Sequence, residues 1–420
     1  MSASVASESL ALHQGASTVP AVDDASTKSE LRVLQIFSVL SVGGAETWMM
    51  ALLRYFSEAK EALGVTVKSD ILLTGGKQSI FDDEARALGA RLFYVPFSRR
   101  SPLKFAREFR RILSVGNYDV IHDHQDYVAG LHFAMGLGRL PRIKIAHVHS
   151  AVSHRSQYAN DRVRTVSMAT GKRMLRRLAT HVLGTSRHAI DEYGFQVPGF
   201  RGVSVVNCGF DTDRFSGNYT DAHAEACHEF GWEQSARVLL FAGRLDGAEV
   251  LVNARVMSQK NADFALEVAR ECFARDERVR LVMAGSGEEK KRQLEARVNA
   301  WGMGERVRFL TGRADIPRLM LGSDLLLFPS LAEGLGMVAV EAQAAGLRVL
   351  ASDSTPDECV VVPDLVNFLS LRLPPEVWAE EALKAMSLNR ANGDTCRAAV
   401  RQSPFSIENS AATLLNVYRG

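Results

Sequence analysis

The stretch that decides the fold reads FPSLAEGLGMVAVEAQAAG and occupies positions 328–346. An apolar strand is predicted to end at Pro329 and Ser330, where a loop that carries two glycines begins. A helix is predicted to start near Met337 and to stop at Gly346, because glycine accepts the left-handed conformation that often follows a helix. Strand, loop and helix in this order form one unit of a doubly wound parallel sheet.

Two carboxylates flank the start of this predicted helix. Glu333 lies in the loop, and Glu341 lies about one turn inside the helix. The main-chain amides from Gly334 to Met337 would point to a position between them where a phosphate could sit. Carboxylates accept hydrogen bonds from vicinal hydroxyls, so one could hold a sugar and the other a ribose. The alternative is a solvated loop acid beside a surface helix acid.

The same alternation of strand and helix extends along the chain in two series. We expect one Rossmann-like domain at residues 30–208, a second at 209–403, and a last helix within 404–420 that can cross back to the first domain. Residues 1–29, rich in Ser, Ala and Thr, are expected to be a disordered lead-in. Ligands of open parallel sheets bind beyond the carboxyl ends of the strands, so the cleft between the domains is the expected site. The predicted strands are 32–37, 69–73, 91–95, 119–123, 144–149, 181–185, 238–242, 279–284, 307–310, 325–328 and 348–351.

Length and composition narrow the class of protein. The chain has 420 residues, of which 46% are hydrophobic and 23% charged, as in a globular enzyme with two or three domains. Its longest uncharged apolar stretches end after about a dozen residues, too few to span a membrane. The first residues lack the features of a secretory signal, and the five cysteines are scattered. We therefore expect a reduced, cytoplasmic compartment.

Charge is distributed unevenly between the two halves. Residues 31–208 contain 25 Lys and Arg against 14 Asp and Glu, whereas residues 209–420 contain 24 against 30. An anionic lipid surface suits the basic half better than nucleic acid, because aromatic residues are not interleaved with the charges. A solvated helix face is the alternative. Much of the excess lies on two stretches with helical spacing, at Arg99, Arg100, Lys104, Arg107, Arg110, Arg111, Arg162, Arg164, Lys172, Arg173, Arg176 and Arg177.

The first predicted strand runs into a loop with paired glycines, Gly43 and Gly44, and then into a helix. Such a loop lets main-chain amides approach an anion at a helix N-terminus, so a phosphate could sit here. An ordinary tight turn is the alternative. The loop is neither a Walker loop nor a G-x-G-x-x-G dinucleotide fingerprint, which makes a nicotinamide dehydrogenase a poor interpretation.

These pieces, in this order, resemble the retaining glycosyltransferases of family 4, which adopt the GT-B fold. The pattern Pro-Ser-x-x-Glu-Gly-x-Gly-x-x-x-x-Glu-Ala at 329–342 is similar to the signature of that family. The resemblance covers roughly residues 31–370. The other matching pieces are the glycine loop at 43–46, the interdomain segment at 207–215, Gly243-Arg244-Leu245, Ser258-Gln259-Lys260-Asn261 and Gly312-Arg313-x-Asp315.

The resemblance implies a role for each of these residues. Glu341 would bind the ribose hydroxyls of a nucleotide-sugar, and Glu333 the hydroxyls of the transferred sugar. Arg244 and Lys260 would hold the diphosphate, so the resemblance implies neither a metal nor another cofactor. Further donor-binding positions carried over from the family are Gly43, Gly44, Gly312, Arg313, Leu335, Gly336 and Met337.

The sequence departs from the family pattern at two places. Residues 246–257 intervene between the Gly-Arg turn and Lys260, where family members have only a few residues, so Lys260 is the less secure assignment. We favour a surface hairpin for this insert over a flap that covers the donor. Cys208 replaces the usual glycine of the interdomain motif.

Histidines near the ends of two strands of the first series need separate weighing. His122, His124 and Asp126 match the H-x-H-x-D of binuclear zinc hydrolases in part, but downstream ligands are missing, and we expect no metal. His149 best matches the active-site histidine of the family, which the resemblance implies would stabilise charge at the anomeric carbon through its carbonyl or its ring. A core histidine is the alternative.

We therefore expect a retaining, metal-independent hexosyltransferase that uses a nucleotide-diphosphate sugar, with UDP-sugars favoured, and a glycan or lipid-linked acceptor in polysaccharide biosynthesis. The basic first domain suggests a peripheral position at the inner face of the plasma membrane, and no nucleic-acid partner is expected. Two alternatives stay open: a GT-B-like nucleotide-sugar epimerase, which would react without an acceptor, and a non-catalytic nucleotide-sugar-binding subunit.

Overall fold

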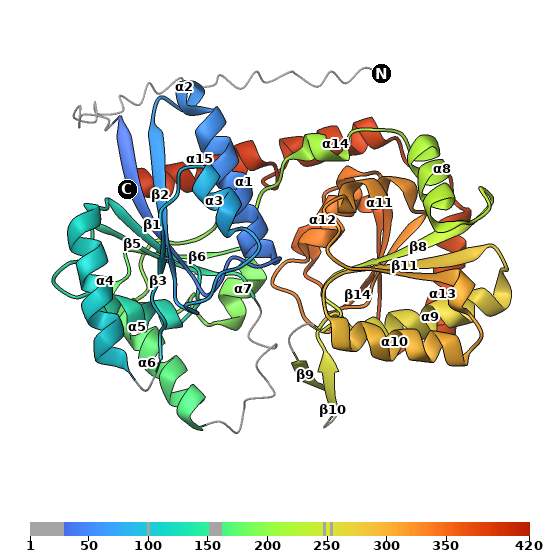
Figure 1. Cartoon of the computed structure of the whole chain (residues 1–420), viewed down its shortest axis with the longest axis horizontal. Helices are drawn as coiled ribbons and strands as arrows, with labels where there is room; N and C mark the ends of the chain where they lie inside the picture. The colour runs from blue at the N-terminus through green and yellow to red at the C-terminus, as the bar shows by residue number, and fades with distance from the viewer. Residues whose placement is uncertain (1–28, 99–100, 151–161, 247–248, 253–254) are drawn as a thin grey trace, which may run out of the picture.

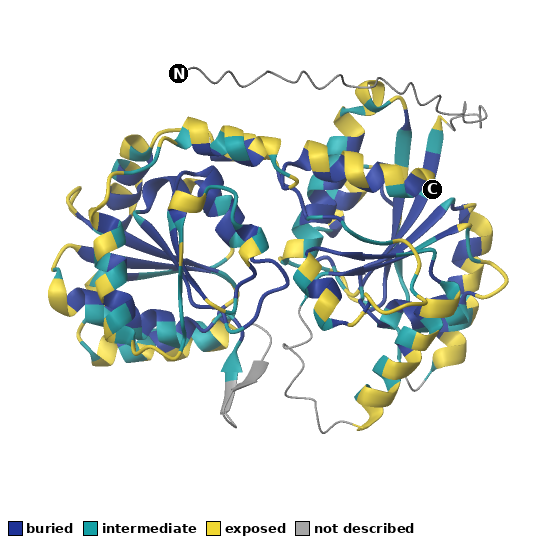
Figure 2. Ribbon diagram, turned by 180° about the vertical axis from the view of Figure 1, so that it is seen from behind, coloured by how far each residue is buried: buried dark blue, intermediate teal, exposed yellow. Residues whose placement is uncertain are grey.

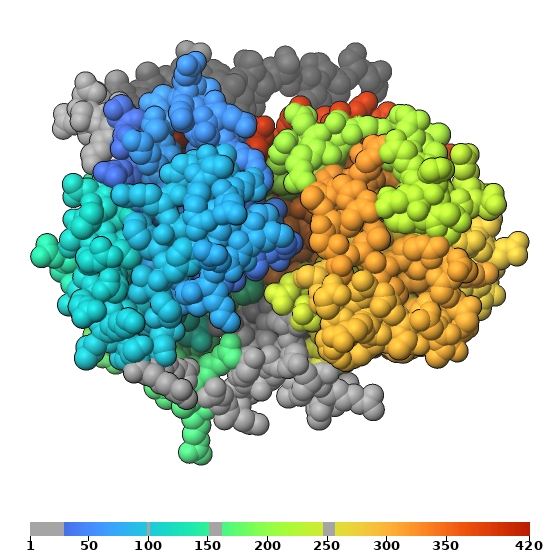
Figure 3. Space-filling model, in the orientation of Figure 1, coloured from blue at the N-terminus to red at the C-terminus, as the bar shows by residue number. Residues whose placement is uncertain are grey.

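The computed structural model describes residues 29–98, 101–150, 162–246, 249–252 and 255–420. They form two α/β domains side by side (Figure 1), with a groove between them (Figure 3). Each domain has a parallel sheet with helices on both faces, and the buried residues follow the two sheets (Figure 2). Residues 1–28 of the expected lead-in, and also Arg99 and Arg100, lie outside the described residues.

The first domain holds a seven-stranded parallel sheet in the order β3-β2-β1-β4-β5-β6-β7. The strands are β1 (Glu30–Phe37), β2 (Thr66–Leu73), β3 (Leu92–Tyr94), β4 (Val120–Asp123), β5 (Ile143–Val148), β6 (His181–Gly184) and β7 (Val203–Val205). The helices are α1 (Gly44–Glu58), α2 (Lys60–Leu63), α3 (Asp82–Ala87), α4 (Pro102–Gly116), α5 (Val128–Met135), α6 (Arg162–Leu178) and α7 (Arg187–Glu192).

The second domain holds a six-stranded parallel sheet in the order β12-β11-β8-β13-β14-β15. Its strands are β8 (Arg237–Ala242), β11 (Val279–Ala284), β12 (Val307–Leu310), β13 (Leu325–Phe328), β14 (Arg348–Ser352) and β15 (Val366–Leu369). Its α-helices are α8 (Tyr219–Phe230), α9 (Ala262–Arg275), α10 (Glu288–Ala300), α11 (Ile316–Gly322), α12 (Met337–Ala344), α13 (Pro375–Ser387) and α14 (Gly393–Gln402). Short 3-10 turns are η2 (Thr212–Phe215), η3 (Gly304–Arg306), η4 (Asp357–Cys359) and η5 (Pro363–Leu365).

Continuous apolar runs explain why both sheets are parallel and covered on both faces. All four residues of the central strand β13 are buried, as are the last five of β1. The expected α/β fold with two Rossmann-like domains is confirmed. Each predicted strand corresponds to an observed one with ends displaced by at most three residues.

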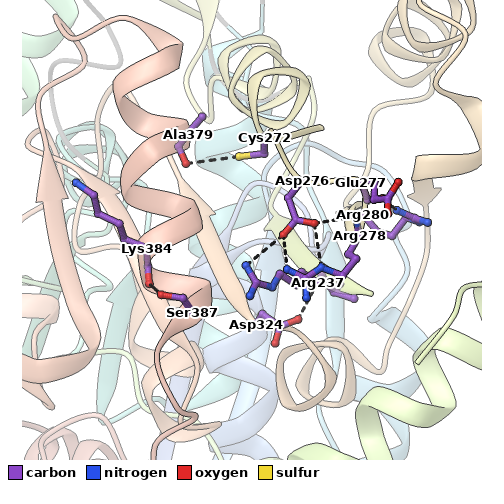
Figure 4. A network of polar contacts seen from close by, with 11 residues as sticks. Arg237, Cys272, Asp276, Glu277, Arg278, Arg280, Asp324, Ala379, Lys384 and Ser387 are labelled. Atoms are coloured by element: carbon purple, nitrogen blue, oxygen red, sulfur yellow. Dashed lines mark hydrogen bonds and ion pairs between the residues drawn. The ribbon is translucent and has the colours of Figure 1, made fainter. Parts of the chain in front are cut away.

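Ion pairs fix the amino-terminal end of the second sheet, away from the carboxyl ends that carry the candidate site (Figure 4). Asp276 accepts hydrogen bonds from Arg278 at 2.8–3.0 Å, which lower the pKa of its carboxyl, and its Oδ2 lies 3.2 Å from Arg237. Asp324 Oδ2 accepts the amide of Val238 at 2.7 Å. Since Arg237 and Val238 begin β8, these contacts hold the start of that strand.

The chain crosses between the domains twice, and the two crossings pair with each other. The amide of Phe210 donates to the Phe405 carbonyl, and the amide of Ile407 donates to the Phe210 carbonyl, both at 3.0 Å. Gly209 has to be small here, because a Cβ at this position would lie 2.4 Å from the carbonyl oxygen of Ser406. The close pairing fixes where the last helix leaves the second domain.

That last helix, α15 (Ile407–Arg419), packs into the core of the first domain. Its buried face contributes Ile407, Ala411, Leu414, Leu415 and Tyr418 to the cluster that contains strand β1 and helix α1. Figure 1 shows it alongside α1, far from the sheet that precedes it in the sequence. The end of the chain therefore belongs structurally to the first domain.

Within the insert, β9 (Glu249–Val252) and β10 (Arg255–Ser258) pair as antiparallel strands. They extend from the second domain below the groove in Figure 1. Among the described residues, no helix has the length and apolar character that crossing a membrane requires.

Candidate active site

The loop after β13 brings Glu333 against Lys260. Glu333 is 6% exposed, and its Oε1 lies 2.5 Å from the Lys260 Nζ, which also lies 5.3 Å from the centre of the Phe328 ring. Gln259 anchors this segment, because its Nε2 donates to the Ala332 carbonyl and its own carbonyl accepts the Leu331 amide, both at 2.7 Å. Despite the preceding insert, the structure therefore places Lys260 at the loop.

Glu341 is the fifth residue of α12 and is half-buried. Burial raises the pKa of its carboxyl to about 7, and the charges of Arg214 and Lys260 act in the opposite direction. Lys260 thus lies within electrostatic reach of both carboxylates. Arg214, on η2, also donates to the Ala314 carbonyl at 3.1 Å and so joins the interdomain segment to the Gly312 loop.

The N-terminus of α12 faces the same place. Its N-cap residue, Gly336, has φ of 92°, and a Cβ there would come within 3.0 Å of Thr355 and 3.2 Å of Phe328. Within the described part of the chain, no side chain caps this end. The amides around Leu335, Gly336 and Met337 therefore supply unsatisfied donors and a partial positive charge beside Glu333 and Glu341.

Two arginines from the sequence prediction lie in different environments. Arg244 is half-exposed, with its Nε 3.5 Å from Asp246, and its charge reaches Glu46 on α1 of the other domain. Arg313 follows Gly312, which has φ of 69°, and its Nε donates to Asp315 at 2.6 Å. Arg313 also forms an ion pair with Glu229. Its hydrogen bonds to Asp315 and Glu229 raise the pKa of the guanidinium. Arg313 therefore braces its loop, whereas Arg244 faces the cleft.

On the first domain, His149 follows β5 and meets the Glu333 loop. A Cβ on Gly334 would lie 2.3 Å from the His149 carbonyl oxygen, so these two backbones touch across the groove. The Gly334 carbonyl also accepts a hydrogen bond from Ser186, at the start of α7. Burial lowers the pKa of the His149 ring to about 3, so the ring is neutral at pH 7.

The glycine loop before α1 lies on the same side of the groove. Glu46 folds back over the helix start, and a Cβ on Gly43 would lie 2.4 Å from its Oε2, whereas Gly44 is exposed with open space around it. Burial raises the pKa of Glu46, and Arg244 opposes this. Gly43 thus makes room for a carboxylate of this chain, and Gly44 leaves the main chain accessible.

Three buried histidines, His122, His124 and His147, bring one ring nitrogen each to within 4.8 Å of one another, close enough for a metal ion. Hydrogen bonds already engage both ring nitrogens of His122 and of His124. Asp126, the third member of the partial zinc pattern, instead accepts from the Tyr193 hydroxyl at 3.0 Å and from the amide of His149 at 3.3 Å. The histidines therefore form a hydrogen-bonded network.

Sequence reasoning missed Glu358, which ties the two domains together. Its carboxylate accepts the amides of Arg187 at 2.7 Å and His188 at 2.8 Å, at the first turn of α7. No sequence motif indicated Glu358, because the two amides that donate to it lie 171 and 170 positions away along the sequence. Beside it lies a hollow of about 330 Å³, lined by His188, Glu192, Leu331, Ala332 and residues 353–356. Both domains contribute to its wall.

Comparison with known proteins assigns the family. The model described as "Glycosyltransferase Family 4" matches residues 42–214, and the one described as "Glycosyl transferases group 1" matches residues 241–399. EpsF of Bacillus subtilis (strain 168), which is named as a glycosyltransferase, is 30% identical over 394 residues, which are 93% of this chain and 97% of EpsF. This chain belongs to the family 4 glycosyltransferases.

Further comparisons give a second relative and the fold. The D-inositol 3-phosphate glycosyltransferase of Salinispora tropica is 28% identical over 324 residues, or 73% of this glycosyltransferase and 65% of that protein. Anabaena HepE in complex with UDP and glucose superimposes with a TM-score of 0.71 at 16% identity, over 93% of this chain and all of HepE. WaaG, a glycosyltransferase involved in lipopolysaccharide biosynthesis, gives 0.67 at 17% identity, over 91% and 99% of the two chains. The two domains therefore form a GT-B fold.

Proposed function

We propose that this glycosyltransferase moves a hexose from a nucleoside-diphosphate sugar, with a UDP-sugar favoured, to a hydroxyl group of a glycan or lipid-linked acceptor. The observation that carries the proposal is the position of Lys260, which pairs with Glu333 and acts electrostatically on Glu341, beside the uncapped N-terminus of α12 and the loop that contacts His149. UDP and UDP-glucose occupy complexes of the structural neighbour HepE, which supports this class of donor.

The proposed donor spans the two carboxylates. The ribose diol would donate to Glu341, the sugar hydroxyls to Glu333, and the diphosphate would lie between them on Lys260, Arg244 and the amides of α12. Lys260 now pairs with Glu333, so the diphosphate would share a cation that is already in place. Fixed cationic groups of this kind stabilise the negative charge that develops on a departing phosphate without needing to reorganise.

We propose a reaction that retains the configuration of the anomeric carbon. The acceptor oxygen attacks the carbon on the face from which the phosphate leaves. As the carbon–oxygen bond to the phosphate breaks, the acceptor proton passes to the departing phosphate oxygen. The nucleoside diphosphate leaves with the bonding electron pair and that proton, and no side-chain nucleophile is required. The carbonyl of His149, which touches the Glu333 loop, supplies a partial negative charge near the developing positive charge.

The acceptor side is proposed to dock on an anionic membrane surface at the inner face of the plasma membrane, in polysaccharide biosynthesis. Helix α6 carries exposed Arg173 and Arg177, and near its start Val163 and Val166 are 55% and 64% exposed. Apolar side chains beside arginines are typical of helices that lie in a lipid interface. The involvement of the neighbour WaaG in lipopolysaccharide biosynthesis is consistent with this proposal.

A thermal-shift screen tests the donor site. The protein is melted with UDP, GDP, ADP and dTDP, each with and without EDTA, and the series is repeated on Glu341→Ala. Because a ligand that binds the native state raises the melting temperature, one nucleotide should give a shift that EDTA leaves unchanged and Glu341→Ala weakens. No shift with any nucleotide, or an undiminished shift in the variant, would contradict the donor assignment. Turnover of the matching donor with a hydroxylated acceptor then separates a transferase from an epimerase.

A further inference from the structure

A continuous hydrogen-bonded chain connects the last helix to the candidate active site. The Tyr418 hydroxyl on α15 accepts from Gln35 Nε2 at 3.0 Å, and Gln35 Oε1 lies 3.0 Å from His124 Nε2. His124 Nδ1 lies 2.9 Å from His149 Nε2. Tyr418, Gln35 and His124 are buried, at 1%, 1% and 8% exposure. The last helix, α15, is thus connected to His149 through the side chains of Gln35 and His124.

The orientation of the Gln35 side-chain amide, with Nε2 toward Tyr418 and Oε1 toward His124, sets the direction of every hydrogen bond in this network. The Gln35 oxygen can only accept, so His124 must carry its proton on Nε2 and accept with Nδ1. His149 must then donate from Nε2, which leaves a lone pair on its Nδ1. That nitrogen lies 3.6 Å from the sulfur of Cys208, and Thr185 Oγ1 donates to the same sulfur at 3.4 Å. The thiol hydrogen of Cys208 is therefore available to His149 Nδ1.

Tyr418 also governs a second branch. Its hydroxyl oxygen accepts from Gln35, and its hydroxyl hydrogen is available to its second partner, His122 Nδ1, at 2.8 Å; with that bond made, His122 Nε2 donates to His147 Nδ1 at 3.1 Å. Burial lowers the pKa of all four histidine rings, so each ring is neutral and holds one proton. In a neutral ring, the partner of one nitrogen sets which nitrogen carries the proton, and Tyr418 contacts both Gln35 and His122, where the two branches begin.

Contacts of Trp48 and Ser410 hold α15 in place independently of the hydrogen bonds of Tyr418. Trp48 packs edge-on against His147, with ring centres 5.3 Å apart, and its Nε1 donates to Ser410 of α15 at 2.9 Å. The Ser410 hydroxyl in turn donates to the Asn207 carbonyl at 2.6 Å. Ser410 therefore fixes the position of α15, whereas Tyr418 is hydrogen-bonded to the network that contains the histidines.

We propose that Tyr418 is a positioning residue for the transfer reaction, which through Gln35 and His124 holds His149 as the tautomer protonated on Nε2. Both ring nitrogens of His149 are then engaged within the protein, and the residue meets the substrate through its main-chain carbonyl, which touches Gly334. The catalytic part of this inference rests on the proposed function, whereas the tautomer itself does not.

The direct test is nitrogen NMR of the full chain labelled with ¹⁵N-histidine. We expect His149, assigned by its loss in His149→Asn, to show a protonated Nε2 and an unprotonated Nδ1. The opposite tautomer in the wild-type protein would overturn the inference, and so would stoichiometric zinc on the protein by elemental analysis, since zinc would displace these hydrogen bonds. This measurement needs no active enzyme and no stable Tyr418 variant.

The variant test compares Tyr418→Phe with Ser410→Ala. Tyr418→Phe should turn the His149 signals into a mixture of tautomers and lower kcat about 10- to 100-fold, while the donor KM stays within about twofold because Lys260 and Glu341 are untouched. Ser410→Ala, the matched control on the same helix, should lower the melting temperature and leave the histidine signals and kcat unchanged.

The two parts of the experiment also separate the two proposals. Unmoved His149 signals in Tyr418→Phe, or an equal fall in kcat in both variants, would overturn the inference. If the expected tautomers are found but the wild-type protein transfers no sugar with any donor, the tautomer assignment stands and the proposed function fails.

Discussion

Raising the pH from 6 to 8 should tighten nucleotide binding about tenfold through Glu341. Burial raises the pKa of this carboxyl to about 7, so about a tenth of the protein carries the ionised form at pH 6 and about nine tenths at pH 8. A ribose diol donates its hydrogen bonds to the ionised carboxylate, so only that fraction is fully competent to bind. The apparent Kd scales inversely with the competent fraction, which gives the tenfold change.

The assay is calorimetric titration at pH 6, 7 and 8 with the nucleotide that the thermal-shift screen selects. Its nucleoside is titrated in parallel, because phosphate groups themselves titrate near pH 6. Glu341→Gln keeps the size of the side chain but removes the ionisation, so the nucleoside should bind it weakly and with no dependence on pH. A wild-type nucleoside affinity that stays constant from pH 6 to 8, or an equal pH dependence in Glu341→Gln, would refute the reasoning.

The same pKa makes a prediction for stability. The folded protein holds the Glu341 proton up to about pH 7, whereas an unfolded glutamate releases it near pH 4.5. Stability therefore falls as the pH rises between these values, by about 3 kcal/mol, and the cost is fully present above pH 7. Glu341→Gln should consequently unfold at a higher denaturant concentration than the wild type at pH 8, with the advantage lost near pH 4.5.

Three further perturbations test other parts of the structure. Lys260→Met should lower the free energy of unfolding, measured by chemical denaturation, by about 3 to 5 kcal/mol, because it leaves Glu333 buried without its cation. Adding Glu333→Gln to this variant should recover the stability but not the sugar-transfer activity. If Lys260→Met is as stable as the wild type, the ion pair has no structural role. Glu358→Ala removes two interdomain hydrogen bonds and should favour an open arrangement by about 1 to 2 kcal/mol, visible as a larger radius of gyration in X-ray scattering; an unchanged radius with and without donor would argue against a latch. Arg173→Gln combined with Arg177→Gln should weaken binding to vesicles that contain phosphatidylglycerol by about fivefold for each arginine, and salt should release the wild type; vesicle binding that is indifferent to salt would contradict electrostatic docking.

The sequence predicted the fold well where strands are long and buried on both faces. The runs that became β1 and β13 are apolar throughout their inner positions, and their lengths suit strands. The strands it missed, β7 and β15, are edge strands of three and four residues, and β15 carries an exposed asparagine. The other two edge strands, β3 and β12, have the same lengths and were predicted, so shortness and edge position alone do not explain the two misses.

The site was predictable only as far as a local motif reaches. The loop and helix around Glu333 and Glu341 form a continuous stretch, so their spacing could be recognised. The pairing of Arg313 with Glu229 could not be predicted, because 84 positions separate the two residues and only the packing of α8 beside the loop brings them together. Gln35 is the clearest case: it interrupts an apolar strand, and its burial makes sense only when His124 and Tyr418 are in place.

The two crossings between the domains lie beside the candidate active site, and this position constrains how the groove can open. Cys208 touches the His149 ring, Gly209 rests on Ser406, and the next residues lead into η2, which carries Arg214 toward Glu341. A rotation about this pivot would move His149 little, because its ring is hydrogen-bonded to His124 of the first domain and lies against Cys208 of the crossing itself. It would move the Glu333 loop much more, because that loop belongs to the second domain and meets the first domain where Gly334 contacts His149. Opening should therefore separate the donor carboxylates from a fixed His149, and closure should restore the contact between Gly334 and the His149 carbonyl.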